Sequence, residues 1–218
     1  MKAYRKSRID ELVKFDKKYA KTHVIIGTDE AGRGPVAGPV VACALCFHKY
    51  NKELSEALKY LDDSKKFSSN PKLRKELSEE IKNYALYGLA ECTVKEIEEI
   101  NILQASLLAM KRACNNLISN MNSDKDIKIL IDGRFLIKKY PYEQIPIVKG
   151  DSKSAAIAAA SIIAKVHRDE MMIKLAEEYP KYNWHQNKGY PTPAHLDAIR
   201  NYGICCWHRR SFLSKLGF

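Results

Sequence analysis

The sequence of 218 residues has no long apolar runs, and none approaches the roughly 18 residues that a membrane-spanning helix requires. The basic segment 1–8 is not followed by the apolar stretch of a secretory signal peptide. These absences argue against a membrane partner and against secretion, and we expect a cytoplasmic protein. The length predicts one domain, or one domain with a small appendage.

Common metal and nucleotide motifs are also absent. There is no Gly-Lys-Ser/Thr of a phosphate-binding loop, and the spacing of His185, His195 and His208 fits no zinc motif, so we expect structural or substrate-edge roles for these histidines. Cys43 and Cys46 are spaced like half of a zinc site or a redox pair. They lie in an apolar run that predicts a strand and would point to its opposite faces, which favours core packing.

Negative charge is in short supply. The chain carries 37 Lys and Arg against 26 Asp and Glu, which gives a net charge of +11. Such an excess attracts polyanions through its long-range field and through counterion release. Nucleic acid is therefore the leading candidate partner, and the alternative is a basic protein without such a ligand.

Strands alternate with helices along the chain, which predicts an α/β fold. A short loop joins the first two strands, so these would pair antiparallel in a mixed sheet. The predicted strands are 24–29, 40–47, 87–93, 127–131 and 145–148. The predicted helices are 5–20, 71–84, 94–100, 101–120 and an alanine-rich helix from 152 to about 178, followed by short helical pieces.

Acidic residues follow three of these strands: Asp29 and Glu30, then Asp132, then Asp151. Ligands of open α/β sheets lie beyond the carboxyl ends of strands, so these acids are expected to meet. Carboxylates crowded together in a low dielectric cannot all stay ionised, and hard divalent cations resolve that conflict. An acidic pocket in a basic chain predicts a metal-dependent nuclease.

Each acid also has a plainer interpretation. Asp151 precedes a helix and is suited to capping it, Asp132 with Gly133 is an ordinary turn signal, and Asp29 with Glu30 fits a solvated loop. Asp169 is excluded from the pocket, because a continuous helix would place it about 27 Å along the axis from Asp151. A structural ion pair is expected there instead.

The loop Gly32-Arg33-Gly34 follows the first acidic pair. Glycines let a main chain approach a ligand where a Cβ would clash, and exposed N–H groups beside an arginine suit a phosphate. A site for a nucleoside triphosphate is a second interpretation of this loop.

Several stretches then occur in one order along the chain. They are GTDEAGRGP (27–35), DSKK (63–66), INILQAS (100–106), IDG (131–133), KGDSK (149–153), AAASIIAK (158–165), RD (168–169), KGYPT (188–192) and HRRSF (208–212). Together they resemble the ribonuclease HII family, the type 2 ribonucleases H, over residues 23–212. The resemblance implies the ribonuclease H-like fold: a five-stranded mixed sheet flanked by helices, with a C-terminal helical extension.

The resemblance also implies an activity. The family cuts the RNA strand of RNA/DNA hybrids and cuts 5′ of single ribonucleotides embedded in duplex DNA, leaving 3′-hydroxyl and 5′-phosphate ends. Its role is removal of misincorporated ribonucleotides in DNA replication and repair. A two-metal site for Mg²⁺ or Mn²⁺ is implied, with Asp29, Glu30, Asp132 and Asp151 as catalytic metal ligands.

For substrate binding, the resemblance implies Gly32, Arg33, Gly34 and Tyr190, the last packing against a sugar. Basic residues are candidates for phosphate contacts, with Lys153 and Lys188 favoured because they flank matched motifs: Lys65, Lys66, Lys149, Lys153, Lys188, Arg209 and Arg210. We expect an N-terminal helical extension over 1–22, a catalytic domain over 23–218, and a monomer with no obligate protein partner. The remaining alternatives are a non-catalytic duplex-binding protein, a nucleotide-binding switch and a nuclease specialised for long hybrids.

Overall fold

A computed structural model of the chain describes residues 8–59 and 70–218. Its centre is a five-stranded sheet in the order β3-β2-β1-β4-β5. The strands are β1 (His23–Ala31), β2 (Val40–Phe47), β3 (Ala85–Cys92), β4 (Asp126–Asp132) and β5 (Glu143–Ile147). The five predicted strands are therefore confirmed, with bounds shifted by up to two residues.

The sheet is mixed, as predicted. β1 pairs antiparallel with β2, and β2 pairs antiparallel with β3. β4 runs parallel to β1, and β5 runs parallel to β4. Because β1, β4 and β5 all point the same way, their carboxyl ends meet at one end of the sheet, and the residues that follow them become neighbours.

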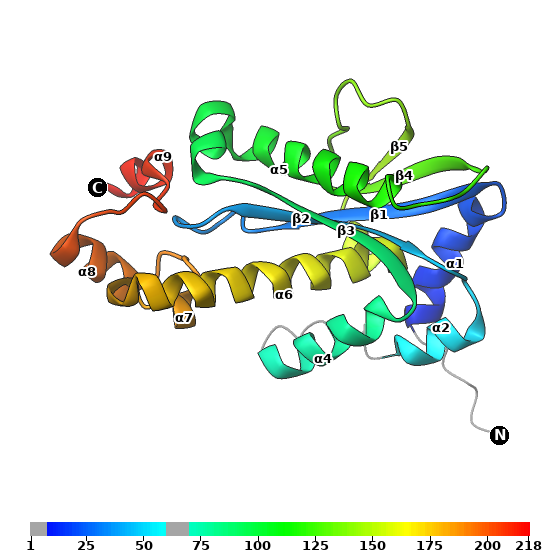
Figure 1. The fold of residues 1–218 in the computed structure, drawn as a ribbon, viewed down its shortest axis with the longest axis horizontal. Coiled ribbons are helices and arrows are strands. Elements are labelled where there is room, and N and C mark those ends of the chain that lie inside the picture. The colour runs from blue at the N-terminus through cyan, green and yellow to red at the C-terminus, as the bar shows by residue number, and fades with distance from the viewer. Residues whose placement is uncertain (1–7, 60–69) are drawn as a thin grey trace.

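Helices cover both faces of the sheet (Figure 1). On one face lies α5 (Val94–Ile118), and on the other lies α6 (Ala155–Glu178) together with α1 (Arg8–Ala20), α2 (Lys52–Ala57) and α4 (Pro71–Lys82). Cys43 belongs to the apolar cluster on the α6 side, whereas Cys46 packs against the cluster on the α5 side. The prediction that these cysteines face opposite sides of a strand is confirmed.

The long helices lie close to the sheet because small residues allow it. A Cβ added to Gly27 of β1 would come within 2.3 Å of the Ala156 carbonyl carbon of α6. One added to Gly88 of β3 would come within 2.4 Å of the Ala113 carbonyl oxygen of α5. These glycines permit main-chain contact, which sets the position of both helices.

The N-terminal helix α1 is built into the fold. Its apolar side chains Ile9, Leu12 and Val13 belong to the same buried cluster as the start of α6. Asp16, fully buried, accepts a hydrogen bond from the Ala156 main-chain N at 2.9 Å. The predicted helix is confirmed, and the division of the chain at residue 22 stays a prediction.

Local details differ from the predictions in three places. The predicted helices 94–100 and 101–120 are one element, α5, with a kink at Asn101, whose φ is 66°. Helix α2, capped by Asn51, was not predicted. The interpretation of Asp151 as the cap of α6 is wrong, because Ser154 caps that helix by accepting from Ile157 N at 3.2 Å.

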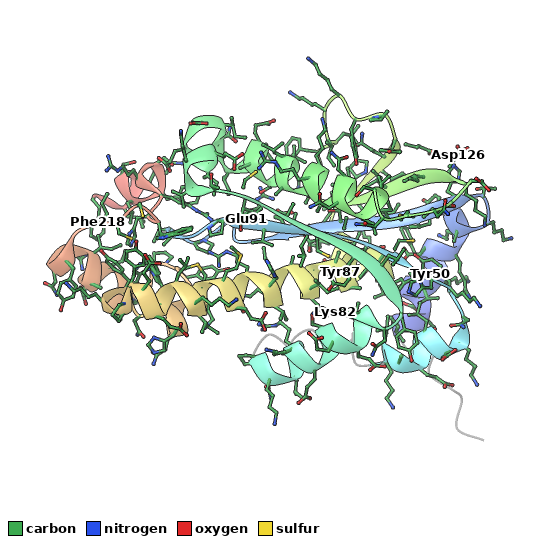
Figure 2. All side chains as sticks on the ribbon, in the orientation of Figure 1. Tyr50, Lys82, Tyr87, Glu91, Asp126 and Phe218 are labelled. Atoms are coloured by element: carbon green, nitrogen blue, oxygen red, sulfur yellow. The ribbon has the colours of Figure 1, made fainter. Side chains whose placement is uncertain are left out.

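The C-terminal extension consists of short elements, as predicted: η2 (Pro180–Tyr182), α7 (Trp184–Asn187), α8 (Pro193–Tyr202), α9 (Arg210–Leu213) and η3 (Ser214–Leu216). They gather at the end of the molecule that carries Phe218, opposite the end where β4 begins at Asp126 (Figure 2). Over the described residues, no helix is both long and apolar enough to cross a membrane.

Candidate active site

The four predicted acids follow the three parallel strands. Asp29 and Glu30 are among the last three residues of β1, Asp132 ends β4, and Asp151 lies in the turn η1 (Gly150–Ser152) that follows β5. The main-chain N of Gly150 donates to Asp132 Oδ1 at 2.6 Å, which ties the end of β4 to this turn. Residues from distant parts of the sequence are thus joined at one end of the sheet.

Electrostatic effects link these acids to one another. Burial raises the pKa of Asp29 well above its usual value, and the negative charges of Glu30 and Asp132 raise it further. Burial also raises the pKa of Asp132, with a further contribution from the charge of Asp151. These contributions connect Asp29 with Glu30 and Asp132, and they connect Asp132 with Asp151, which is exposed. Because such influences are felt over short distances, the four acids lie near one another at this end of the sheet.

Glu30 offers the clearest test of whether a cation fits here. Burial raises its pKa, although its Oε1 accepts from Arg33 Nη1 at 3.0 Å. Its other oxygen, Oε2, is buried and has no hydrogen-bond partner in the described part of the chain. A buried carboxylate oxygen without a partner is costly, and a hard cation is the partner that such an oxygen favours. The donor set therefore fits Mg²⁺ or Mn²⁺.

The side chains do not form a closed metal cage. Across residues 8–59 and 70–218, no three His, Cys, Asp or Glu side chains are placed to hold an ion together. Instead the carboxylates turn to internal partners, as Asp29 Oδ1 does by accepting from Glu30 N at 2.7 Å. Their role as metal ligands stays a prediction.

A cleft of about 250 Å³ adjoins two of these acids, Glu30 and Asp132. One wall is the side of α5 that carries Leu103, Leu107 and Met110. The remaining lining residues are Arg33, Ser106, Gly133, Arg134, Phe135 and Val148. The acids are thus reached from a partly apolar opening with two arginines in its lining.

The glycine-rich loop is held from beneath by two buried arginines. Arg168 donates to the carbonyls of Pro39 at 3.0 Å, Ala37 at 2.9 Å and Lys188 at 3.0 Å. Arg209 donates to the carbonyls of Gly38 at 2.7 and 2.9 Å, of Pro35 at 2.9 Å and of Arg33 at 3.4 Å. The segment 33–39 is therefore fixed by guanidinium groups together with a few main-chain hydrogen bonds, among them Val36 N to Gly189 O and Gly38 N to Trp207 O, both at 2.9 Å.

The position of Arg209 corrects one expectation. It was a candidate for phosphate contact, but its side chain is fully buried, and within the described residues its guanidinium donates to the main-chain carbonyls of Arg33, Pro35 and Gly38. Burial lowers its pKa to about 9, and that of Arg168 to about 10. The role of Arg168 was missed, although the motif at 168–169 was noted. Most arginines are exposed, so sequence alone does not predict a buried arginine whose partners are distant in the chain.

Of the other predicted substrate residues, Tyr190 and Lys188 adjoin the segment 33–39, whereas Lys153 follows the turn η1. Tyr190 is exposed, and its ring atom Cε1 would lie 3.4 Å from a Cβ added to Gly34. Lys188 carries its ammonium against the carbonyl of His185. Lys153 is exposed two residues after Asp151. Lys65 lies outside the described residues, so its predicted role is not placed.

The buried histidines form a structural network. His195 Nε2 accepts from Trp184 Nε1 at 2.9 Å, and its Nδ1 lies 2.9 Å from the carbonyl oxygen of Tyr190. His195 Nε2 also lies 3.2 Å from His208 Nε2. Burial lowers the pKa of His208 to about 4, so both rings are neutral near pH 7. Of the two expected kinds of role, structural or at the substrate edge, the contacts of His195 and His208 are structural, and the network supports the main chain at Tyr190.

Asp169 is not part of the acidic group. It pairs with Arg74 at 3.2 Å and with Lys165 at 2.5 Å. These contacts join α4 to the middle of α6. The predicted structural ion pair is confirmed.

Comparison with known proteins places this geometry in context. A sequence model of the family described as Ribonuclease HII matches residues 26–215. The Ribonuclease HII of Zymomonas mobilis is 48% identical over 189 residues, covering 87% of this chain and 84% of that protein. The crystal structure of ribonuclease H2 from Pyrococcus horikoshii superposes with a TM-score of 0.65 at 28% identity, covering 88% and 95% of the two chains.

A more distant structure, Bst-RNase HIII in complex with Mn²⁺, superposes with a TM-score of 0.62 at 16% identity. The match covers 99% of this chain and 75% of that one, and it shows a shared fold alone. Together with the sheet order, these similarities confirm the expected ribonuclease H-like fold.

Proposed function

The chain belongs to the ribonuclease HII family, which indicates a ribonuclease H endonuclease, and on that premise we propose a divalent-metal-dependent enzyme that cuts 5′ of ribonucleotides in duplex DNA. It would also cut the RNA strand of RNA/DNA hybrids and leave 3′-hydroxyl and 5′-phosphate ends. Its role would be the removal of misincorporated ribonucleotides. The observation that carries the proposal is the placement of four acids at the carboxyl ends of three parallel strands, where Gly150 N ties Asp132 to the turn that contains Asp151.

The acids act as metal ligands in this proposal. Asp29 and Glu30 from β1, Asp132 from β4 and Asp151 from the turn after β5 would hold Mg²⁺ or Mn²⁺. When bound, such ions activate a water nucleophile and stabilise the leaving oxygen of a phosphodiester. The buried Oε2 of Glu30 supports this class of cofactor, because an oxygen without a partner gains one when a cation binds.

Recognition of the ribonucleotide is assigned to the loop and the tyrosine beside it. The 2′-hydroxyl is the group that distinguishes RNA from DNA. The main chain of Gly32-Arg33-Gly34 would contact this hydroxyl and the neighbouring phosphate, and Tyr190 would pack against the next sugar. Arg209 supports this assignment because it donates to the carbonyl of Arg33, and with Arg168 it fixes the residues that follow the loop. A prearranged loop loses less entropy on binding.

The test is cleavage of a DNA duplex that contains one ribonucleotide, with Mg²⁺ or Mn²⁺ present. We expect one cut on the 5′ side of the ribonucleotide and no cut in excess chelator. Full activity in chelator would contradict the metal-dependent mechanism.

Two further substrates separate this proposal from its alternatives. An all-RNA strand paired with DNA identifies a nuclease specialised for long hybrids, which would leave the single-ribonucleotide duplex intact. An all-DNA duplex identifies non-catalytic binding, which would persist with no cut in any substrate. A nucleotide-binding switch predicts saturable triphosphate binding, which a thermal shift with nucleotide would detect.

A further inference from the structure

A second cleft lies where the N-terminal helix α1 meets the turn after β5, next to Asp151 in the sequence. It has a volume of about 420 Å³. Its walls come from α1 and from the two residues that follow Asp151. The lining residues are Glu11, Leu12, Lys14, Phe15, Lys18, Ser152 and Lys153. This cleft therefore joins α1 to the immediate neighbourhood of the acidic group.

The cleft is basic. Lys14, Lys18 and Lys153 are exposed, and within residues 8–59 and 70–218 none of the three forms an ion pair. Lys18 Nζ lies 5.3 Å from the centre of the Phe15 ring, which holds the ammonium over the cleft wall. Glu11 is the one acid in the lining. Three ammonium groups against one carboxylate suit an anionic ligand.

The helix that carries two of these lysines is fixed in place. Asp16, on the opposite side of α1, binds Ala156 N in the first turn of α6. Apolar packing of α1 against the start of α6 reinforces this contact. Lys14 and Lys18 are therefore held at a constant position relative to the turn that contains Asp151.

The cleft lies close enough to Asp151 for one nucleic-acid strand to reach both. Lys153 follows Asp151 by two residues, so their Cα atoms are separated by no more than about 7.6 Å. Phosphates of one strand follow each other at about 3.4 Å along the helix axis. A duplex whose scissile phosphate meets the acids would therefore bring phosphates a few nucleotides away over the cleft.

We propose that the cleft between α1 and the turn 152–153 binds backbone phosphates of the substrate duplex, a few nucleotides from the scissile position. The proposal rests on the proposed function for the location of that position. It gives the N-terminal helix a binding role: α1 extends the substrate surface beyond the sheet and supplies ammonium groups that contact phosphate regardless of base sequence.

The experiment compares two double variants in residues 14–21 with equal changes in charge. Lys14→Gln with Lys18→Gln removes the lysines of the cleft. Lys17→Gln with Lys21→Gln removes two exposed lysines of the same segment that do not line it. All four side chains are exposed, so the stability of the fold is expected to change little. Urea unfolding of each variant verifies this.

Binding to a duplex with one ribonucleotide is measured in excess chelator at several salt concentrations. The cleft variant is expected to bind roughly tenfold more weakly at low salt. Its plot of log K against log salt is expected to be shallower by about 1 to 2, since each lost phosphate contact removes about 0.9 from the slope. The control variant is expected to keep nearly the wild-type slope. Equal losses in both variants would overturn the proposal, because they would reflect the general field of a basic protein.

A duplex-length series locates the contact. The duplex is shortened from one end in one series and from the other end in a second series. In one of the two series the difference in affinity between wild type and the cleft variant is expected to vanish, and in the other it is expected to persist. A difference that persists in both series would place the lysines elsewhere and overturn the proposal. Because binding is measured without cleavage, failure of this contact is distinguishable from failure of the proposed function, which wild-type cleavage with Mg²⁺ tests separately.

Discussion

Asp16 in α1 and Ala156 in α6 are 140 positions apart, yet the carboxylate of the first accepts a 2.9 Å hydrogen bond from the main-chain N of the second. The bond satisfies one of the free N–H groups at the start of α6. It also places a carboxylate inside the core, because Asp16 is fully buried. The contact therefore links the N-terminal helix to the stability of the whole fold.

The stability of the fold is expected to depend on pH through Asp16. Burial raises the pKa of Asp16 to about 7 from its usual 3.8. The folded state then binds more protons than the unfolded chain between these values, so the free energy of unfolding falls as pH rises from about 4 to about 7. The full difference corresponds to roughly 4 kcal/mol. Asp16→Asn, which stays neutral, is expected to remove this dependence in urea unfolding series.

Asp124→Asn is the matched control, because Asp124 is exposed. It should retain the wild-type dependence of stability on pH. An Asp16→Asn variant that loses stability with pH as steeply as wild type would show that this carboxyl is not the group responsible.

Asp132→Asn is expected to lower the cleavage rate by at least about 100-fold, because a charged metal ligand contributes several kcal/mol to catalysis. Its amide oxygen is still able to accept the hydrogen bond from Gly150 N, so the turn after β5 should be retained. Rates are measured under single-turnover conditions, and duplex binding is measured in parallel. Normal cleavage by this variant would show that Asp132 has been assigned the wrong role.

Tyr190 provides a test of substrate recognition. Its ring is exposed beside Gly34, so truncation removes a packing surface with little change in the core. Tyr190→Ala is expected to reduce the preference for a single-ribonucleotide duplex over a long hybrid by roughly 10-fold, the value of one aromatic stacking contact. Tyr190→Phe keeps the ring and should keep most of the preference. If both variants kept the wild-type ratio, sugar packing by Tyr190 would be refuted.

Arg168 is the test of loop support. Arg168→Lys leaves one ammonium facing the carbonyls of Ala37, Pro39 and Lys188, so at least one buried carbonyl loses its donor. We expect a loss of about 3 kcal/mol in the free energy of unfolding. Arg210→Lys, at an exposed position, is the control and should change stability by less than about 0.5 kcal/mol. Similar stability of both variants in urea would show that the three hydrogen bonds are not needed.

Gly27 tests the contact between β1 and α6. Gly27→Ala would place a Cβ 2.3 Å from the Ala156 carbonyl carbon and 2.4 Å from Ile157 N, so the helix must move. We expect a loss of about 2 to 3 kcal/mol in stability. Gly203→Ala meets no atom within 4 Å and suffers only from its φ of 75°, so it should cost about 1 kcal/mol. If the Gly27 variant were as stable as the Gly203 variant, the contact between β1 and α6 would accommodate a Cβ at little cost.

Much of the fold was predictable because the local patterns agree with it. The apolar run before Asp29 predicts the buried strand β1, and the alanines after Ser154 predict a helix that lies close to a sheet. The six-residue α2 was missed because a single cap at Asn51 is a weak signal. The kink at Asn101 also has no local pattern: the residue adopts a positive φ, and its side chain caps the next turn by accepting from Leu103 N at 3.0 Å.

The candidate site was only partly predictable. The acids were found because three strands end in carboxylates, and the resemblance identified the same residues. Arg209 was predicted to contact phosphate, but its guanidinium is buried against loop carbonyls. Nothing near Arg209 in the sequence indicates these partners. Its partners lie more than 170 positions earlier, so the pattern of burial depends on the completed fold.

The same separation has a consequence for biosynthesis. Arg33 and Pro35 leave the ribosome early, whereas Arg209, which binds their carbonyls, is added 176 and 174 residues later. All four acids, the last at 151, are already present by then. A nascent chain thus acquires every proposed metal ligand before it acquires the arginine that binds the carbonyls of Arg33 and Pro35, so the proposed substrate loop is the later of the two parts to be fixed in place.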